Sequence, residues 1–385
     1  MSAATIIGKD ARADALVASY AGAGYARVEP AILQPAEPFL ALSGEDIRRR
    51  MYLIADGGAG DLCLRPDLTI PVALDYLASP DAGKPARLSY LGPVFRQRAG
   101  ASGEFLQAGL ESFGRPDKAA ADAEAVALAL EATALYGLAA PDIRMGDVGL
   151  FAALIAALDL PPVWRRRLAK DFNRKSVLAE DLHRLTEPPG NGPPEYQGVL
   201  TALANSDPKG ARALVADLLS IAGITTVGGR SVAEIAARFL EQAELGAGAA
   251  LPGEVRDLVE RFFAVAGTPA DAAAALRSFA AEAKLDLAAA LDTLDERHRL
   301  LAAAGIDTAR IRFATGFGRG LDYYTGVVFE LHDPAGRIDG QLVAGGRYDG
   351  LFARLGQPEP IAAVGFSVWI ERLVALGAGP AGEAR

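Results

Sequence analysis

The feature that most constrains the fold is a change of sequence pattern along the chain. Residues 1 to about 140 mix helical and strand patterns. Within them, the segment 122–136 repeats apolar residues at helical spacing and stops at Gly137, a residue favoured just beyond a helix end. From about 150 to 295 the composition shifts to Ala and Leu with Arg and Glu, which predicts a bundle of short helices.

The pattern changes again near residue 311. Short runs rich in Val, Phe and Tyr are separated by glycines, as expected of antiparallel strands, and they lie at 311–314, 327–331, 341–344 and 361–368. The last run leads directly into a predicted helix at 369–376. Strand-bearing ends around a helical block predict one α+β domain interrupted by an insertion. The expected division is a first core part at 1–150, a helical insertion domain at 151–295 and a second core part at 296–385.

Length and composition are those of a globular protein. The chain has 385 residues, enough for one main domain and a smaller one, and 51% of them are hydrophobic. Residues 1–22 contain no uninterrupted apolar stretch that would serve as a signal peptide. The longest apolar run, 150–158, is far shorter than the roughly 18 residues that span a bilayer. We therefore expect a cytoplasmic protein without a membrane segment.

Cysteine, histidine and charge content exclude further classes. Cys63 is the single cysteine, so no internal disulfide forms, and the three histidines lie far apart in the sequence. We therefore expect no metal site and no cofactor. The net charge of −9 argues against a protein that mainly holds nucleic acid, because such affinity comes largely from Lys and Arg on phosphates.

Two glycine-flanked stretches carry arginine, aspartate and tyrosine. Residues 317–326 read Phe-Gly-Arg-Gly-Leu-Asp-Tyr-Tyr-Thr-Gly, and residues 344–350 read Ala-Gly-Gly-Arg-Tyr-Asp-Gly. Glycines allow backbone to approach closely. Adjacent tyrosines on a strand point to opposite faces, so we expect only one of Tyr323 and Tyr324 to line a given pocket. Each stretch alone is also compatible with a structural turn or a tight hairpin.

Together the two stretches resemble the two signature motifs of histidyl-tRNA synthetases, in the same order and at about the same separation. Three further segments resemble that family. Leu64-Arg-Pro-Asp-Leu-Thr69 resembles its strand near the amino acid's ammonium group. Gly92-Pro-Val-Phe-Arg96, followed by Gln107 and Glu111, resembles its motif 2, and residues 365–373 resemble its motif 3. The resemblance covers residues 20–140 and 310–376. It implies the antiparallel sheet of class II aminoacyl-tRNA synthetases, flanked by helices.

The resemblance also implies a histidine pocket, and the residue types suit one on physical grounds. A zwitterion needs anions near its ammonium and a cation near its carboxylate, while an imidazole needs acceptors and aromatic walls. Charge-assisted hydrogen bonds contribute roughly 1.5 to 3 kcal/mol each, and a few suffice for micromolar binding. The candidates are Asp67, Thr69 and Gln107 for the ammonium, Arg96 for the carboxylate, Glu111, Tyr323, Tyr324 and Tyr348 around the ring, and Arg319 for either job.

The chain departs from the synthetase pattern where ATP would bind. Synthetases read Phe-Arg-x-Glu in motif 2, the glutamate accepting from adenine, whereas this chain has Arg98 there. In motif 3 they have a glycine close to ATP, and this chain has Trp369. A buried tryptophan covers about 150 to 250 Å². We expect a filled adenosine pocket, although the indole can instead swing into a core. The sequence ends thirteen residues after Arg372, before the anticodon-binding domain of synthetases, so tRNA recognition is not expected.

A histidine pocket without ATP and tRNA sites resembles the regulatory subunits of short-form ATP phosphoribosyltransferase, the first enzyme of histidine biosynthesis. Asp67, where synthetases have Glu, also resembles that family. The resemblance implies a subunit without catalytic activity, a homodimer within a hetero-oligomer, whose partner is the catalytic subunit and whose effector is L-histidine. The sequence shows no acidic pair followed by a Gly/Thr-rich phosphoribosyl-pyrophosphate loop, so we expect the transferase chemistry in the partner.

Two alternatives stay open from the sequence. The retained Arg96, Arg319 and Arg372 are compatible with a truncated synthetase paralogue that forms an aminoacyl-adenylate for a non-tRNA acceptor, against which Arg98 and Trp369 count. An assembly scaffold without a small ligand would require the pocket residues to be accidental.

Overall fold

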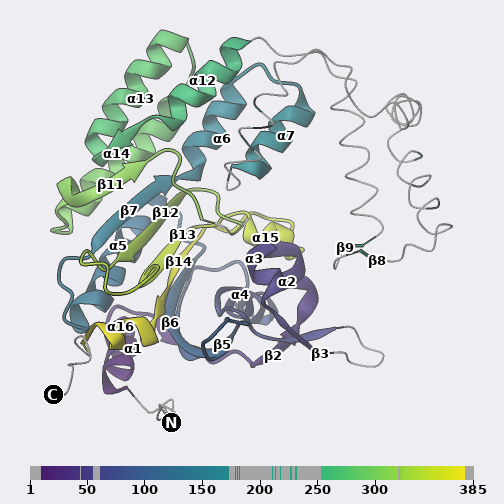
Figure 1. Ribbon diagram of the computed structural model, residues 1–385, viewed down its shortest axis with the longest axis vertical. Helices are drawn as coiled ribbons and strands as arrows, with labels where there is room; N and C mark the ends of the chain where they lie inside the picture. The colour runs from purple at the N-terminus through teal and green to yellow at the C-terminus, as the bar shows by residue number, and fades with distance from the viewer. Residues whose placement is uncertain are drawn as a thin grey trace. The chain divides into compact units, whose positions relative to one another are not determined.

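The computed structural model describes residues 10–43, 45–54, 61–172, 253–319, 321 and 323–377, with isolated residues between 178 and 231 (Figure 1). The chain forms two compact units. Unit 1 comprises Met1–Ala153 and Phe262–Arg385, and unit 2 comprises Leu154–Arg261. Most of unit 2, where much of the helical insertion is predicted, lies outside the described residues.

A nine-stranded mixed sheet forms the centre of unit 1, in the order β1-β5-β6-β14-β13-β12-β7-β11-β10. Its strands are β1 (Ala26–Arg27), β5 (Ala86–Phe95), β6 (Glu104–Phe113), β7 (Asp142–Asp147), β10 (Ala266–Gly267), β11 (Ile311–Ala314), β12 (Val327–His332), β13 (Val343–Arg347) and β14 (Ala363–Trp369). Two neighbouring pairs, β1 with β5 and β7 with β11, are parallel, and the others are antiparallel.

The chain also forms two small antiparallel sheets. One contains β2 (Leu33–Pro35), β4 (Leu62–Leu64) and β3 (Tyr52–Ile54), with β4 in the middle, and the other pairs β8 (Thr226–Val227) with β9 (Arg230–Ser231). In the first of these sheets, β2 and β3 are edge strands. That arrangement leaves apolar side chains of both strands exposed, as described below.

Helices flank the sheet. The described helices are α1 (Ala11–Gly22), α2 (Ala36–Leu42), α3 (Glu45–Arg49), α4 (Thr69–Ala78), α5 (Lys118–Leu135), α6 (Val148–Ala157), α7 (Pro162–Asp171), α12 (Gly253–Phe263), α13 (Pro269–Ala283), α14 (Ala288–Ala303), α15 (Leu351–Arg354) and α16 (Ile370–Gly377), with a 3₁₀ turn at Thr308–Arg310. Figure 1 shows α13 and α14 beside β11, with α2, α3 and α15 gathered away from them. None of the helices in the described part of the chain is both long and apolar enough to cross a membrane.

The sequence patterns predicted most of these elements. The strands at 311–314 and 327–331 are confirmed as β11 and β12, and those at 341–344 and 361–368 as β13 and β14 with shifted ends. The helix predicted at 122–136 is the larger part of α5, which ends as expected: Gly137 has a positive φ of 87°, and the amide of Leu138 donates to the carbonyl of Thr133 at 2.9 Å. The predicted α+β class is confirmed.

The prediction of antiparallel strands holds only in part for β11, which pairs antiparallel with β10 but parallel with β7. The register aligns Ile311 with Ile143 in a parallel pair. Parallel strands require a long crossover connection, and the chain between these two strands supplies one, since it includes all of unit 2 and the helices α13 and α14.

The end of the helical block differs from the predicted boundary at residue 295. Helices α13 and α14 belong to unit 1, where α14 packs against α5. A buried ion pair joins them, since Nε of Arg297 donates to Asp122 at 2.9 Å. The division into 1–150, 151–295 and 296–385 stays a prediction.

An aromatic cluster in the core supports the helix nearest the site. Tyr76 on α4 contacts Phe113 on β6 and Phe352 on α15, with ring centroids 5.0 and 5.5 Å apart. The two phenylalanines meet edge to face at 4.9 Å. Such pairs contribute about 0.5 to 1.5 kcal/mol each beyond the area that they bury. They fix α4, which begins at Thr69 two residues after Asp67, against the sheet.

Candidate functional site

A cavity of about 250 Å³ lies on one face of the large sheet in unit 1. This volume is below the roughly 300 to 1,000 Å³ of pockets that take drug-sized ligands, so it suits a ligand of amino-acid size better than a nucleotide. Seven of the nine residues predicted from the sequence border it: Asp67, Thr69, Arg96, Arg319, Tyr323, Tyr324 and Tyr348. The other two, Gln107 and Glu111, are fully buried on the neighbouring strand β6.

Two buried polar side chains at one end of the site have unused hydrogen-bonding capacity. Oδ1 of Asp67 accepts from the amide of Ile70 at 3.1 Å, but Oδ2 has no hydrogen-bond partner among the described residues. Burial raises the pKa of Asp67, while the Ile70 amide and the charge of Arg96 act in the opposite direction. Neither polar atom of the Gln107 side chain has a partner in the described structure. Buried polar groups are almost always paired, so the two unpaired oxygens, Oδ2 of Asp67 and Oε1 of Gln107, favour a ligand with donors, such as an ammonium group.

The buried carboxyl group of Glu111 lies behind the cavity, close to Thr69. Glu111 accepts from the hydroxyl of Tyr90 at 3.2 Å and from the hydroxyl of Tyr348, which borders the cavity. Burial raises the pKa of Glu111 to about 8, although the tyrosine hydroxyls lower it in part. A glycine is required at Gly365 on β14, because a Cβ there would lie 1.8 Å from Oε2 of Glu111. The site can thus offer an imidazole a protonatable carboxyl group next to a tyrosine hydroxyl.

Both tyrosines of the adjacent pair border the cavity, so the expectation that only one would do so is wrong. Tyr323 and Tyr324 lie in an irregular loop before β12, and the alternation of a strand does not apply to them. Their ring centroids are 5.0 Å apart, and both rings contact Tyr348, at 5.5 and 6.3 Å. Three tyrosines therefore form an aromatic wall.

Two arginines supply positive charge to the cavity. Nε of Arg96 donates to the carbonyl of Pro66 at 2.6 Å, and burial lowers the pKa of Arg96 to about 10, which still leaves it charged at neutral pH. Arg319 donates to the hydroxyl of Tyr324 at 2.6 Å and to Glu330 at 3.1 Å. Burial lowers the pKa of Arg319, but Tyr324 and Glu330 more than offset this and raise it. Either guanidinium can meet a carboxylate.

The sequence analysis missed several charged residues that border the cavity. Glu330 is one of them, and Asp46 and Arg50, which pair with each other at the end of α3, are two more. The pattern of β12 contained a usable signal, because Glu330 and His332 are polar residues two apart in an otherwise apolar strand. Residues two apart share one face of a sheet. For Asp46 and Arg50 the helical i,i+4 spacing shows only that they can pair.

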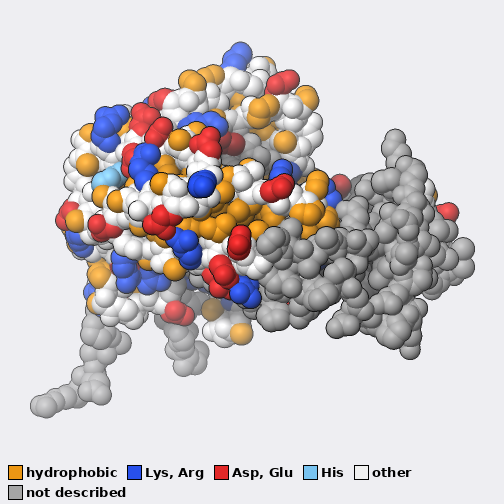
Figure 2. Space-filling view, turned by 90° about the horizontal axis from the view of Figure 1, so that it is seen from above, with side chains coloured by type: hydrophobic (Ala, Val, Ile, Leu, Met, Phe, Trp, Pro, Cys, Tyr) orange, Lys and Arg blue, Asp and Glu red, His pale blue; other side chains and the backbone are white. Residues whose placement is uncertain are grey.

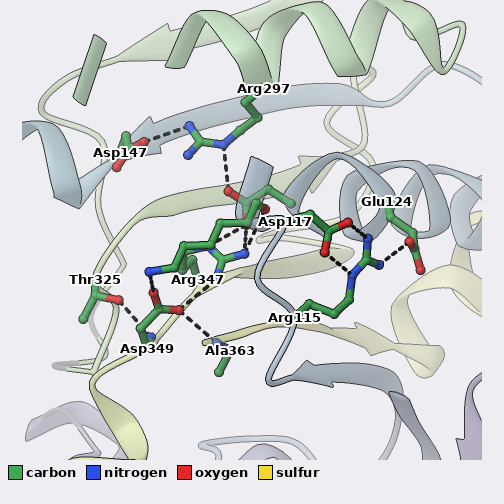
Figure 3. Close-up of polar contacts among 11 residues, drawn as sticks. Arg115, Asp117, Glu124, Asp147, Arg297, Thr325, Arg347, Asp349 and Ala363 are labelled. Carbon is green, nitrogen blue, oxygen red and sulfur yellow. Dashed lines mark hydrogen bonds and ion pairs between the residues drawn. The ribbon is translucent and has the colours of Figure 1, made fainter. Parts of the chain in front are cut away.

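A buried ion-pair network holds the segment that carries Tyr348 (Figure 3). Arg347, on one side of Tyr348, donates to Asp122 on α5 at 2.8 Å, and to Asp349, on its other side, at 2.8 Å. Asp122 also accepts from Arg297 at 2.9 Å. The residues flanking Tyr348 are therefore tied to α5 and, through α5, to α14.

The same network reaches the tyrosine pair and β7. The amide of Asp349 donates to the hydroxyl of Thr325 at 2.9 Å, directly after Tyr324. Arg297 donates to Asp147 at the end of β7 at 2.8 Å. The segments on either side of the aromatic wall are therefore held by buried charges from four elements, α5, α14, β7 and β13.

The two departures from the synthetase pattern occupy neighbouring positions. Arg98 forms an ion pair with Glu371, with one contact at 3.3 Å, and its guanidinium lies 4.4 Å from the ring centre of Phe105. Trp369 is packed in the core and also borders the cavity, and the guanidinium of Arg372 lies 5.4 Å from the Trp369 ring. The indole therefore packs into the core, as in the alternative considered for Trp369, and the filled adenosine pocket stays a prediction.

Metal chemistry has no visible basis in the part of the chain that the structure describes. There, no three or more His, Cys, Asp or Glu side chains are grouped so that they could hold a metal ion.

Comparisons with known proteins agree with this geometry. The family model for histidyl-tRNA synthetase matches residues 9–237 and 210–373. Two proteins named ATP phosphoribosyltransferase regulatory subunit, from Mesorhizobium japonicum and Brucella canis, are each 44% identical to this chain over 355 and 352 residues, covering 91% of this chain and 92% of theirs. A crystal structure of an ATP phosphoribosyltransferase regulatory subunit/histidyl-tRNA synthetase from Bacillus halodurans shares the fold, with a TM-score of 0.65 and 23% identity over 95% of this chain and 78% of that one. The predicted synthetase-like fold is thereby confirmed, and the chain belongs to the family of ATP phosphoribosyltransferase regulatory subunits.

Proposed function

We propose that this chain is a histidine sensor without catalytic activity that regulates a separate catalytic subunit of ATP phosphoribosyltransferase in the cytoplasm. The observation that supports this most strongly is the small cavity itself. Asp67 borders it with an unsatisfied acceptor, two arginines supply positive charge to it, and the buried carboxyl group of Glu111 bonds to Tyr348 of its aromatic wall. An L-histidine zwitterion presents the complementary groups.

Each part of the ligand has a proposed partner. The ammonium group is expected to donate to Asp67, Thr69 and Gln107, which would satisfy the buried acceptors. The carboxylate is expected to lie against Arg319 and Arg96. For the imidazole we propose Glu111 and Tyr348, with Tyr323 and Tyr324 completing the wall.

The proposed absence of catalysis is supported by the surroundings of Arg98 and Trp369. Arg98 is a donor whose charge is already compensated by Glu371, so it cannot accept from an adenine amino group. Trp369 adds an indole to the wall of a cavity that is small for a nucleotide. We propose that the chain has lost ATP binding and, with it, amino-acid activation.

We further propose that two copies of the chain form a homodimer within the hetero-oligomer. Four large apolar side chains on or beside the edge strands β2 and β3 are 41% to 52% exposed: Ile32, Leu33, Leu53 and Ile54. Exposed apolar side chains on edge strands are common in protein interfaces. Burying them against a second copy would remove that exposure.

Calorimetry of the purified chain with histidine, and separately with ATP, tests the proposed function. We expect histidine to bind with a micromolar Kd and ATP not to bind. Histidine-dependent exchange of pyrophosphate into ATP above a no-enzyme control would instead support the truncated synthetase paralogue. Absence of histidine binding would contradict the sensor.

A further inference from the structure

Glu330 is a carboxylate that already holds the arginine proposed for the ligand's carboxylate. Its Oε1 accepts from Nε of Arg319 at 3.1 Å, and its Oε2 lies 3.0 Å from Nε2 of His332. Glu330 and Arg319 both border the cavity, and their side chains are only 18% and 10% exposed. Any carboxylate bound at Arg319 would therefore lie near a second carboxylate.

The surroundings of Glu330 keep it ionised. Burial alone would raise the pKa of Glu330, but His332 and Arg319 lower it below its usual value. On the neighbouring strand β7, Arg144 lies directly opposite in the register, and its own guanidinium pairs with Asp142 at 3.0 Å. Arg319 therefore faces a full negative charge before any ligand arrives.

We propose that Glu330 sets the histidine threshold of the sensor by competing with the ligand's carboxylate for the charge of Arg319. The inference rests on the proposed histidine-binding function. It makes Glu330 a specificity-determining residue, since its effect is confined to ligands that carry a carboxylate. A ligand that lacks this group gains nothing when the charge of Glu330 is removed.

Glu330 has two opposing effects on histidine binding, and their sizes decide whether it strengthens or weakens that binding. Holding Arg319 in place favours binding, because ordering a long side chain costs roughly twofold to tenfold in a binding constant. Repulsion between two carboxylates about 6 Å apart, at an effective dielectric constant near 20, corresponds to about a hundredfold. Partial exposure screens this repulsion. Glutamine at this position keeps an acceptor for Nε of Arg319 while removing the charge, so it retains the first effect and abolishes the second.

The test compares Glu330→Gln with the wild-type chain for two ligands, L-histidine and L-histidinol, which has a CH₂OH group in place of the carboxylate. Calorimetry at one pH and salt concentration gives the four Kd values. Glu371→Gln is the matched control, because it also removes one negative charge, from a residue that pairs with Arg98 and does not border the cavity. We expect the Kd for histidine to fall about tenfold in Glu330→Gln and the Kd for histidinol to change less than about twofold. Glu371→Gln should change neither value by more than about twofold.

The remaining outcomes contradict either the role of Glu330 or the proposed function. If wild type binds histidine but Glu330→Gln binds it equally or more weakly, the threshold role is wrong and the sensor function stands. An equal gain for histidinol would show that the substitution acts without the ligand's carboxylate, which also overturns the role. If wild type binds no histidine, the proposed function fails and the inference fails with it.

Discussion

At the scale of single residues, the side chain of Gln107 lies in a fully buried position with both polar atoms unpaired in the described structure. Such a group costs about 1 to 3 kcal/mol of stability, which a purely structural residue would have no reason to keep. We predict that Gln107→Leu raises the free energy of unfolding of the empty chain by about 1 kcal/mol and weakens histidine binding about tenfold. Urea unfolding and calorimetry measure the two effects.

Gln97→Leu is the control for this substitution. Its exposed side chain donates to the carbonyl of Met51 at 3.3 Å and does not border the cavity. It should leave histidine binding unchanged. A Gln107→Leu chain that is less stable than wild type and binds histidine normally would show that Gln107 has a structural role only.

Glu111 gives the chain a predictable dependence of stability on pH. Burial raises its pKa to about 8 in the folded chain, from an ordinary value of 4.5. Between these values the folded state holds a proton that the unfolded state has lost, so its contribution to stability is full below about pH 4.5 and declines as the pH rises towards 8. We predict that Glu111→Gln removes a slope of up to about 1.4 kcal/mol per pH unit from the unfolding free energy in this window. Urea unfolding at pH 5.5, 6.5 and 7.5 measures it, and parallel profiles of the two chains would contradict the assignment.

At the scale of elements, Asp122 on α5 joins β13 to α14. It lies between two buried guanidinium groups, those of Arg297 and Arg347. Removing one partner of a buried ion pair typically costs about 3 to 5 kcal/mol, because the remaining charge stays buried. We predict a loss of this size in the free energy of unfolding for Asp122→Asn. Asp117→Asn, at the start of the same helix and in a half-exposed pair with Arg115, should cost less than about 1 kcal/mol. Equal losses in urea unfolding would contradict the network's role.

The elements also show what sequence patterns can and cannot predict. The strand at 327–331 was predictable because its valines and phenylalanine favour strands locally, and Gly137 ended α5 through its own backbone conformation. The parallel pairing of β11 with β7 was not predictable in this way, because it depends on where the chain returns to the sheet after a long connection. The expectation for the two tyrosines applied the alternation of a strand to them, whereas the chain there forms a loop.

For the candidate site, the resemblance predicted nine residues, whereas the residues that surround them became known only from the fold. Seven of the nine named residues border one cavity. Glu330 went unnamed because its contact with Arg319 depends on how the loop before β12 folds back over that strand. The pairing of Arg98 with Glu371 joins positions 273 residues apart, a separation that no local pattern reveals.

At the scale of the whole molecule, the exposed apolar side chains of β2 and β3 make a prediction about assembly. Leu53 is 52% exposed on β3. We predict that Leu53→Glu shifts the chain from dimer to monomer at micromolar concentration, because a charge would be buried in the interface. Light scattering after size-exclusion chromatography measures this. Val374→Glu, at a 37% exposed apolar position on α16, should remain dimeric. If Leu53→Glu and Val374→Glu have the same mass as wild type, the interface lies elsewhere.

The charge distribution agrees with a protein partner rather than a polyanion. On the face in Figure 2, the described Lys and Arg side chains are interspersed with Asp and Glu instead of forming one basic patch. The net charge of the chain is −9. Nucleic-acid affinity depends largely on clustered cations, and the described residues on this face form no such cluster.

The most direct test of the central claim is the rate of a short catalytic ATP phosphoribosyltransferase subunit from the same organism, measured with and without this chain over a range of histidine concentrations. The account predicts that adding the chain changes the rate. It also predicts that histidine at micromolar concentrations inhibits the mixture but not the catalytic subunit alone, since a ligand can shift the complex only through its differential affinity for the active and inhibited states. A rate and a histidine response that are the same with and without the chain would contradict the claim that it is the sensor.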